Sequence, residues 1–464
     1  MKLTFWGAAQ TVTGSLHMLE FSGRRVFLDC GLFQGRRSEG RRWNRDFPAD
    51  PASVDAVLLS HAHIDHSGLL PRLYREGFRG PVYATSATGD LCASMLPDSA
   101  YIQKKDAEWV NRREGRRGKK RIEPLYTSAD VAGVLDLFES VDYDRPFQPF
   151  PGLEVTYRDA GHILGSATMV LEIEEGGRTV KLGFSGDVGR EGRPILRDPQ
   201  PMDDCDYLIS ESTYGGKVHD PPQQAKERLA EVVSATAKRG GKVIIPAFAV
   251  GRTQELVYRL DQLTTEGRLP PIPVFVDSPL AVNVTDVFRR HPECYDAELR
   301  AYMEQDPDPF GFSRLAYIRD VEDSKRLNGS KLPMVIISAS GMAEAGRILH
   351  HLRNAVEDPK NTVMMVGYCA PHTLGRRLIE RRPEVNIFGK PHTLRAEVEV
   401  MNSYSAHADE PELLRFVGHL DPDRLKRIFL VHGDPNRQIA LTEALGAVGY
   451  RDVHRPERGE TIEL

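Results

Sequence analysis

The chain has 464 residues, of which 40% are hydrophobic, and its formal net charge is −5. Five cysteines without a CxxC pair exclude a disulfide framework and a cysteine-based zinc site, and no apolar run reaches the roughly 18 residues of a membrane helix. The length favours two or three domains, and the N-terminal residues lack a signal-peptide pattern. We therefore expect a globular, cytoplasmic protein without a membrane partner.

The first segment, residues 1–215, is predicted to mix short strands with helices. Strands, several of which alternate apolar and polar residues, are predicted at residues 2–7, 15–21, 24–31, 55–60, 81–85, 153–160, 167–174, 179–186 and 206–212. Helices are predicted at residues 69–77 and 87–113. This pattern favours a mixed α/β sandwich with the helices outside the sheets.

Residues 58–71 read LLSHAHIDHSGLLP and carry four metal-type ligands, His61, His63, Asp65 and His66. The ligands follow an apolar strand and precede a helix. Two side chains two positions apart on an extended backbone point the same way, as His61 and His63 would. One metal ion cannot easily take all four ligands from so short a segment, whereas two adjacent ions can.

Three further ligand-type residues follow apolar strands later in the chain: His162, Asp187 and His432. Histidines and carboxylates at fixed positions fit zinc best, and manganese is an alternative for a dinuclear site with carboxylates. We expect two Zn²⁺ ions. One would be held by His61, His63 and His162, the other by Asp65, His66 and His432, with Asp187 as a bridge.

Residues 216–390 are predicted to alternate helices with buried strands such as KVIIPAFAV and PMVIISAS. Strict alternation of this kind favours a doubly wound parallel sheet. Residues 391–464 then return to strand-like LRAEVEVMNSYS and to His407 and His432, and we assign them to the first domain. The second domain is therefore predicted to be inserted into the first, with the site between them.

The motifs in this order resemble the metallo-β-lactamase-fold β-CASP ribonucleases, which include the nuclease subunit of the pre-mRNA 3′-end cleavage and polyadenylation factor. The resemblance rests on the HxHxDH loop, on ISESTYG, NSYSAHAD and VHGD, and on GRTQE (251–255) and SASGM (338–342). It implies an αββα sandwich with an inserted doubly wound β-CASP domain. Its bacterial members are compatible with a homodimer.

The resemblance also implies roles that spacing alone leaves unassigned. It implies hydrolysis of single-stranded RNA by a zinc-activated hydroxide, which leaves 5′-phosphate and 3′-hydroxyl ends. Asp65 would accept the proton of the attacking water, His407 would protonate the leaving oxygen, and Glu211 would orient His407. Asp29 would support a metal-binding histidine. We expect an endonuclease in RNA processing or decay, although the sequence does not separate internal cleavage from cleavage at an end.

Basic and small residues suggest where RNA would bind. Candidate phosphate contacts at strand-to-helix junctions and on a basic helix are Arg252, Thr253, Ser338, Ser340, Gly341 and Arg376. Three basic stretches, residues 35–45, 111–121 and 375–382, indicate segregated positive charge in a chain of negative net charge. Trp43 or Tyr214 could stack on a base.

Three other functions remain open at this stage. A DNA nuclease of the same family would need the same residues. A thioesterase or lactonase of the same fold would share the metal chemistry, but the inserted domain, Glu211 and His407 disfavour it. A non-catalytic RNA-binding subunit is disfavoured because every expected ligand position is filled.

Overall fold

The computed structural model describes residues 1–35, 37–114, 121–219, 223–367, 369, 372–401 and 405–464. They divide into two compact units. Unit 1 consists of Met1–Glu191, Asp198–Val218 and His407–Leu464, and unit 2 consists of Gly192–Arg197 and His219–Ala406. Within the described residues, no helix combines the length and the apolar character that crossing a membrane requires.

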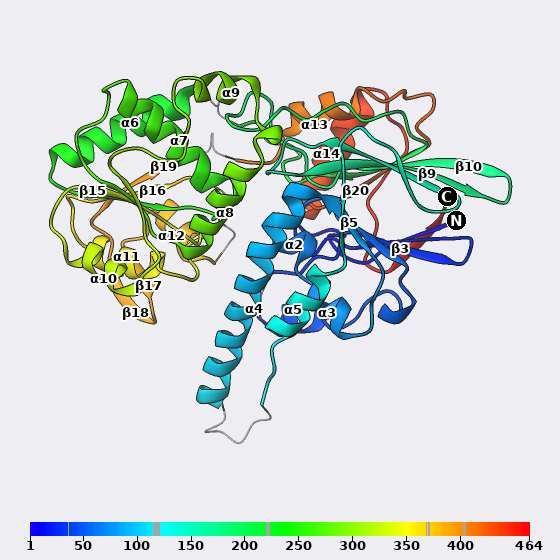
Figure 1. Ribbon diagram of the computed structural model, residues 1–464, viewed down its shortest axis with the longest axis horizontal. Helices are drawn as coiled ribbons and strands as arrows, with labels where there is room; N and C mark the ends of the chain where they lie inside the picture. The colour runs from blue at the N-terminus through cyan, green and yellow to red at the C-terminus, as the bar shows by residue number, and fades with distance from the viewer. Residues whose placement is uncertain (36, 115–120, 220–222, 368, 370–371, 402–404) are drawn as a thin grey trace. The chain divides into compact units, whose positions relative to one another are not determined.

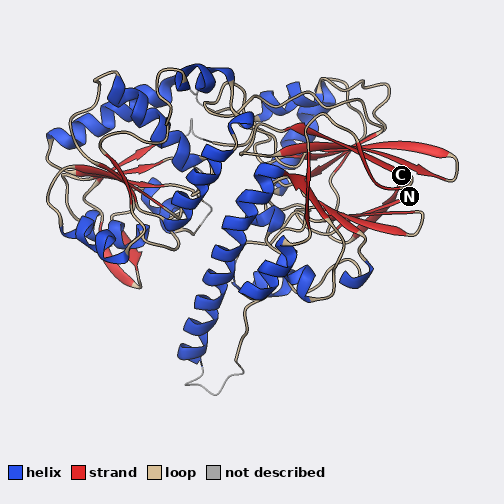
Figure 2. Ribbon diagram, viewed as in Figure 1, coloured by secondary structure: helices blue, strands red, loops and turns tan. Residues whose placement is uncertain are grey.

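Unit 1 contains two seven-stranded sheets, drawn as red arrows in Figure 2. The first has the order β22 (Glu460–Glu463), β1 (Lys2–Phe5), β2 (His17–Phe21), β3 (Arg24–Leu28), β4 (Ala56–Leu58), β5 (Val82–Thr85) and β6 (Phe138–Val141). The second has the order β21 (Val453–His454), β20 (Arg427–Val431), β11 (Tyr207–Glu211), β10 (Arg178–Phe184), β9 (Ala167–Glu175), β8 (Leu153–Asp159) and β7 (Phe147–Phe150). All the strands predicted for residues 1–215 are present.

Alternation along the strands explains how the layers of unit 1 pack. In β20, Phe429 and Val431 join the core between the two sheets, whereas Ile428 and Leu430 join a second core under α13 and α14. Successive strand residues point to opposite faces, so the apolar run of residues 428–431 serves both cores. Helices therefore cover the outer face of this sheet, as the expected αββα sandwich requires.

The helices of unit 1 are mostly short. They are α1 (Arg37–Trp43), α2 (Ile64–Ser67), α3 (Leu70–Arg75), α4 (Ser86–Glu114), α5 (Ser128–Leu135), α13 (Glu410–Val417) and α14 (Pro435–Ala447), with a 3₁₀ turn η1 at Pro51–Ser53. The exception is α4, whose first half packs against β5 and β6 of the first sheet. Its second half extends beyond the sheet (Figure 1).

Unit 2 is built around a six-stranded, wholly parallel sheet. Its order is β14 (Leu315–Tyr317), β13 (Val274–Val276), β15 (Met334–Ser338), β12 (Lys242–Pro246), β16 (Thr362–Met365) and β19 (Glu397–Val400). The helices are α6 (Gln223–Lys238), α7 (Arg252–Thr265), α8 (Pro279–Arg290), α9 (Ala297–Met303), α10 (Val321–Gly329), α11 (Ile348–Ala355) and α12 (Leu374–Ile379), with a 3₁₀ turn η3 at Pro292–Cys294. The expected parallel α/β insertion is confirmed.

Two features of unit 2 differ from the expectation. The strand predicted to return to the first domain, β19, pairs instead with β16 at the edge of the parallel sheet. A hairpin of β17 (Glu384–Ile387) and β18 (Lys390–Thr393) precedes it. Unit 2 therefore extends past residue 390 to Ala406.

Candidate metal centre

The HxHxDH loop begins where β4 ends and leads into α2. Three main-chain hydrogen bonds hold it: Ser15 N donates to Asp65 O (2.7 Å), Cys30 N to His66 O (2.8 Å) and Leu32 N to Ile64 O (2.9 Å). A Cβ atom at Gly31 would collide with the carbonyl of Asp65, so glycine is required for this close approach. The loop is thus fixed by two neighbouring loops before any ion binds.

Strand ends of the second sheet bring the distant candidates to the same place. His162 lies in the turn between β8 and β9, Asp187 follows β10, and His432 follows β20. Because β10, β11 and β20 are parallel neighbours, the residues after them share one edge of the sheet. Asp29 and His432 have φ angles of +60° and +48°, a sparsely populated region in which strained functional residues are often found.

The first group of ligand atoms consists of His61, His63, His162 and one oxygen of Asp187. His61 Nε2 lies 3.1 Å from His63 Nδ1, and His162 Nε2 lies 3.3 Å from the same atom. The Oδ2 atom of Asp187 lies 3.4 Å from His61 Nε2 and 3.5 Å from His162 Nε2.

The second group consists of Asp65, His66 and His432, with the other oxygen of Asp187 beside it. The Nε2 atoms of His66 and His432 are 3.2 Å apart, and Asp65 Oδ2 lies 3.6 Å from His432 Nε2. Asp187 Oδ1 lies 3.3 Å from His66 Nε2. Each oxygen of Asp187 therefore faces a different group, the arrangement that a bridging carboxylate needs.

These separations fit zinc. Tetrahedral coordination with zinc–nitrogen bonds of about 2.0–2.1 Å places neighbouring ligand atoms about 3.3 Å apart. Burial lowers the pKa of His61 and His162, and it lowers the pKa of His63 to about 3. These three imidazoles of the first group are therefore neutral, the form that binds metal. The residues that the sequence predicts as two metal sites thus form two groups with suitable donors and spacing.

Neighbouring polar groups fix the orientation of the ligand rings. Asp29 Oδ2 lies 2.6 Å from His66 Nδ1, so the Nε2 atom of His66 is directed at the second group. Ser60 Oγ lies 3.0 Å from His61 Nδ1, and Thr213 Oγ1 lies 3.1 Å from His432 Nδ1. Asp29 thus has the contact that its expected supporting role requires. Ser60 and Thr213 were not predicted from the sequence, although Ser60 directly precedes the motif.

Glu211 and His407 meet beside Asp187. Glu211 Oε1 lies 3.3 Å from His407 Nδ1 and also accepts a hydrogen bond from Val188 N at 2.7 Å. Burial alone would lower the pKa of His407, but the carboxylates of Glu211 and Asp187 raise it to about 9. The main chain of His407 bridges to Gly189, which holds the ring at the edge of the site. His407 can therefore hold a proton close to both groups of ligands.

Several candidate phosphate contacts in unit 2 are engaged inside the fold. The side chain of Arg252 is buried and pairs with Glu255, and the hydroxyls of Thr253 and Ser338 donate to main-chain carbonyls. Both threonine and serine are 1% exposed. They therefore stabilise the strand-to-helix loops, and we no longer assign them to phosphate.

The other three candidates of this group differ in their surroundings. Gly341 is buried against the ring of Phe248. Ser340 is partly exposed, and its Oγ atom accepts a hydrogen bond from Glu344 N at 3.1 Å. Arg376 is exposed and pairs with Glu380 at 2.8 Å. Ser340 and Arg376 remain candidates for contact with a phosphate.

The basic stretches are only partly described. Arg36, Arg116, Arg117, Lys119 and Lys120 lie outside the described residues, and the side chains of Arg37, Arg41 and Arg113 are also outside them. Among the described residues, Arg42, Arg45, Arg112 and Arg121 are exposed.

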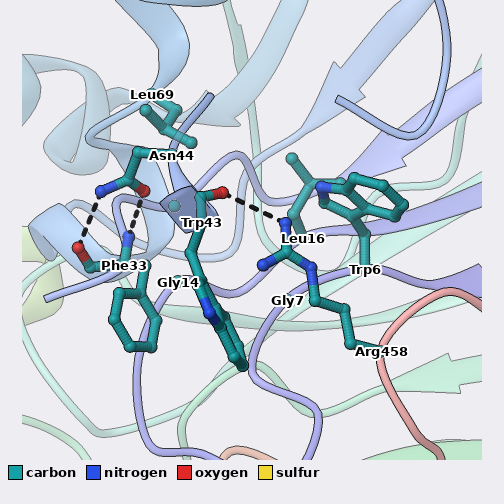
Figure 3. Close-up of a pocket in the computed structure, with 10 residues that line it drawn as sticks. Trp6, Gly7, Gly14, Leu16, Phe33, Trp43, Asn44, Leu69 and Arg458 are labelled. Atoms are coloured by element: carbon teal, nitrogen blue, oxygen red, sulfur yellow. Dashed lines mark hydrogen bonds between the residues drawn. The ribbon is translucent and has the colours of Figure 1, made fainter. Parts of the chain in front are cut away.

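A small pocket in unit 1 contains the guanidinium of Arg458 between two indole rings (Figure 3). The Cζ atom of Arg458 lies 4.8 Å from the ring centre of Trp6 and 4.6 Å from that of Trp43. Its Nη2 atom donates to the carbonyl of Trp43 at 3.1 Å. Phe33 covers Trp43 with a centroid distance of 4.6 Å. Trp43 thus fastens the end of α1 to the C-terminal segment and is not available as a base-stacking surface.

Tyr214 is the other candidate for base stacking. Its ring centre lies 6.1 Å from that of His407.

Three family models match the chain. The Beta-Casp domain matches residues 253–378, the Zn-dependent metallo-hydrolase RNA specificity domain matches residues 391–456, and the Beta-lactamase superfamily domain matches residues 24–234. Together they span nearly the whole chain in the expected order.

Similar proteins agree with these matches. The chain is 39% identical to Ribonuclease TTHA0252 of Thermus thermophilus over 464 residues, which cover 100% of both proteins. It is 32% identical to Transcription termination factor FttA of Methanosarcina mazei, covering 96% of this chain and 69% of that protein. A crystal structure of a protein of unknown function from Enterococcus faecalis covers 100% of this chain and 99% of its own, with a TM-score of 0.54 and 12% identity. That similarity supports the fold alone.

Proposed function

Since the chain belongs to the metallo-β-lactamase-fold β-CASP family, we propose that it is a zinc-dependent ribonuclease acting on single-stranded RNA. The observation that carries the proposal is the pair of ligand groups that share Asp187. RNA as the substrate is supported by the match to the RNA specificity domain over residues 391–456 and by the named activity of the Thermus relative.

We assign the two groups of ligands to two Zn²⁺ ions, with Mn²⁺ as the alternative. His61, His63 and His162 would hold one ion, Asp65, His66 and His432 the other, and Asp187 both. When bound, such ions lower the pKa of water and offset negative charge on an attacked phosphate. The protein's part is to fix the ligands: Asp29, Ser60 and Thr213 orient three of the imidazoles.

Proton transfer falls to side chains of the protein. Asp65 has one oxygen near His432, is partly exposed, and is the candidate acceptor for the proton of the attacking water. His407 is the candidate acid that protonates the leaving 3′-oxygen, because it lies at the edge of the site and carries a proton near neutral pH. Glu211 keeps the imidazole aligned through its Nδ1 atom. The products would be a 5′-phosphate and a 3′-hydroxyl.

The test uses zinc-loaded protein and 5′-end-labelled single-stranded RNA. Fragment lengths over time separate internal cleavage, which gives intermediate sizes at once, from removal of single nucleotides at an end. Phosphatase-dependent relabelling of the new 5′ ends checks for the 5′-phosphate. A DNA strand of the same sequence and a panel of thioesters and lactones serve as comparison substrates. Preferential turnover of DNA or of a thioester would contradict the proposal.

A further inference from the structure

The second half of α4 forms an arm. The returning segment, residues 121–126, lies beside it. Asn111 exchanges two hydrogen bonds of 2.9 Å with the main chain of Ile122. Leu125 N donates to Gln103 Oε1 at 3.2 Å, and the hydroxyl of the buried Tyr126 lies 2.7 Å from Ser99 Oγ. The returning segment therefore covers one face of the helix along three turns.

The opposite face of α4 carries large, exposed side chains. Tyr101 is 59% exposed, Trp109 is 47% exposed and Ile102 is 45% exposed. Lys105 and Arg112 are exposed on the same part of the helix. At 100° per residue, these five positions fall within an arc of about 100°, and Tyr101 to Arg112 spans about 16 Å. We call this set the α4 face.

Aromatic and basic groups alternate along the α4 face. Lys105 Nζ lies 5.5 Å from the ring centre of Tyr101, between the positions of the two aromatic residues. Lys105 also pairs with Glu108 at 3.3 Å, an exposed ion pair that opens at little cost. Along the sequence, residues 112–121 at and after the end of the helix contain seven arginines and lysines and one glutamate.

This combination points to a single-stranded polyanion with flat bases. Exposed patches of large apolar side chains mark interaction surfaces, and a purely apolar partner would not favour the interleaved cations. Proteins hold single-stranded nucleic acid by stacking bases on aromatic rings and contacting phosphates with basic side chains. We propose that the α4 face binds single-stranded RNA outside the metal centre, so that it retains long RNA chains. This proposal rests on the proposed RNA substrate.

The test compares RNA binding by variants in a His407→Ala background, which prevents turnover. Tyr101→Ala/Trp109→Ala should weaken binding of a labelled 30-nucleotide RNA about tenfold or more and leave binding of a 6-nucleotide RNA unchanged. Lys105→Gln/Arg112→Gln should reduce the slope of log affinity against log salt by about 1.4, the value for two phosphate contacts on a single strand. Tyr101→Phe/Trp109→Phe should restore binding, because the rings are kept.

Two control variants make the comparison specific. Lys104→Gln removes an exposed charge from the same helix outside the α4 face, and Phe388→Ala removes an exposed ring from unit 2. Both should bind RNA like the background protein. The proposal would be overturned if the α4 variants bound the 30-nucleotide RNA as tightly as the background protein does. If, in addition, light scattering showed that the α4 substitutions change the mass of the protein in solution, the α4 face would instead be a contact between two copies of the chain.

The failure of this proposal differs from failure of the proposed function. If the parent protein does not cleave RNA but the α4 variants still lose affinity for long RNA, the α4 face stands and the catalytic assignment falls. If the parent cleaves short and long RNA, and the same α4 substitutions made with His407 intact leave the KM for long RNA unchanged, the catalytic assignment stands and the α4 face falls.

Discussion

Glu211 and His407 lie 196 positions apart in the chain, yet Glu211 Oε1 is 3.3 Å from His407 Nδ1. Glu211 is 0% exposed at the end of β11 and accepts a main-chain hydrogen bond from Val188. Its carboxylate is therefore fixed before it contacts His407. This pair places the protonated imidazole of His407 next to Asp187. His407 itself is not a ligand in either proposed ion site.

Replacing His407 should separate proton donation from metal binding. We expect His407→Ala to keep both zinc ions and to lose about 10²–10⁴-fold in kcat on RNA. A p-nitrophenyl phosphodiester, whose leaving group needs no proton, should lose far less. Glu211→Gln should show the same pattern with a loss of about 10–100-fold. Equal losses on both substrates would remove His407 from the role of acid.

Asp187 should be essential for metal content. Because its two oxygens face two groups of ligands, Asp187→Ala should lower the zinc measured by elemental analysis from two ions per chain to one or none. Asp29 contacts the ring of one predicted ligand, His66, so Asp29→Asn should weaken zinc binding by about 10–100-fold in a chelator competition. Full zinc occupancy in Asp187→Ala at limiting metal would contradict the bridge.

The two groups of ligand-type residues were predictable because their signals are local or lie at strand ends. The HxHxDH motif follows an apolar strand, and His162, Asp187 and His432 each follow a further apolar strand. The positions of Ser60 and Thr213 could not be predicted, since any serine or threonine near a strand end has the same local pattern. Which of these reaches an imidazole depends on how the sheets pack.

The inserted unit shows where local patterns fail. Ser338 and Thr253 look like phosphate contacts in small-residue loops, but their hydroxyls donate to main-chain carbonyls. Strand β15 ends at Ser338, but the helix after it, α11, begins only at Ile348, because residues 341–347 form turns in which Ser340 Oγ accepts a hydrogen bond from Glu344 N. The short strand β14 and the helices α9 and α10 were not predicted. A three-residue, partly buried strand has too little apolar pattern to detect.

Arg252 was predicted to contact a phosphate, but it belongs to a buried ion network. Glu255 pairs with both Arg252 and Arg193, and all three side chains are less than 10% exposed. Glu255→Gln would remove the carboxylate that pairs with both buried guanidinium groups, so we expect a loss of about 3–5 kcal/mol in the free energy of unfolding. Urea denaturation measures this loss.

A matched change near the end of the same helix is the control for Glu255. Glu266 is exposed and pairs with Lys226, so Glu266→Gln should cost about 1 kcal/mol or less. If Glu255→Gln and Glu266→Gln unfold at the same urea concentration, Glu255 contributes nothing specific and the network is not a source of stability.

Asp261 should make the stability of unit 2 depend on pH. It is 1% exposed in α7, and burial, together with the nearby Asp306 and Asp308, raises its pKa to about 7, although Tyr302 donates a hydrogen bond of 2.9 Å to its carboxylate. An unfolded aspartate has a pKa of about 3.9. Between these values only the folded state binds the proton, so the free energy of unfolding falls as pH rises, and the loss is complete above about pH 7.

Asp261→Asn removes this titration and should therefore be more stable than the parent at pH 8. The gain should be on the order of 1–3 kcal/mol, and a domain of this size gains about 2–4 °C in Tm per kcal/mol. At pH 4.5 the difference should shrink, because the parent is then protonated in the folded state. Glu304→Gln, which removes an exposed carboxylate nearby, should shift Tm little at either pH. A gain in Asp261→Asn that is the same at both pH values would show that Asp261 is already ionised in the folded protein.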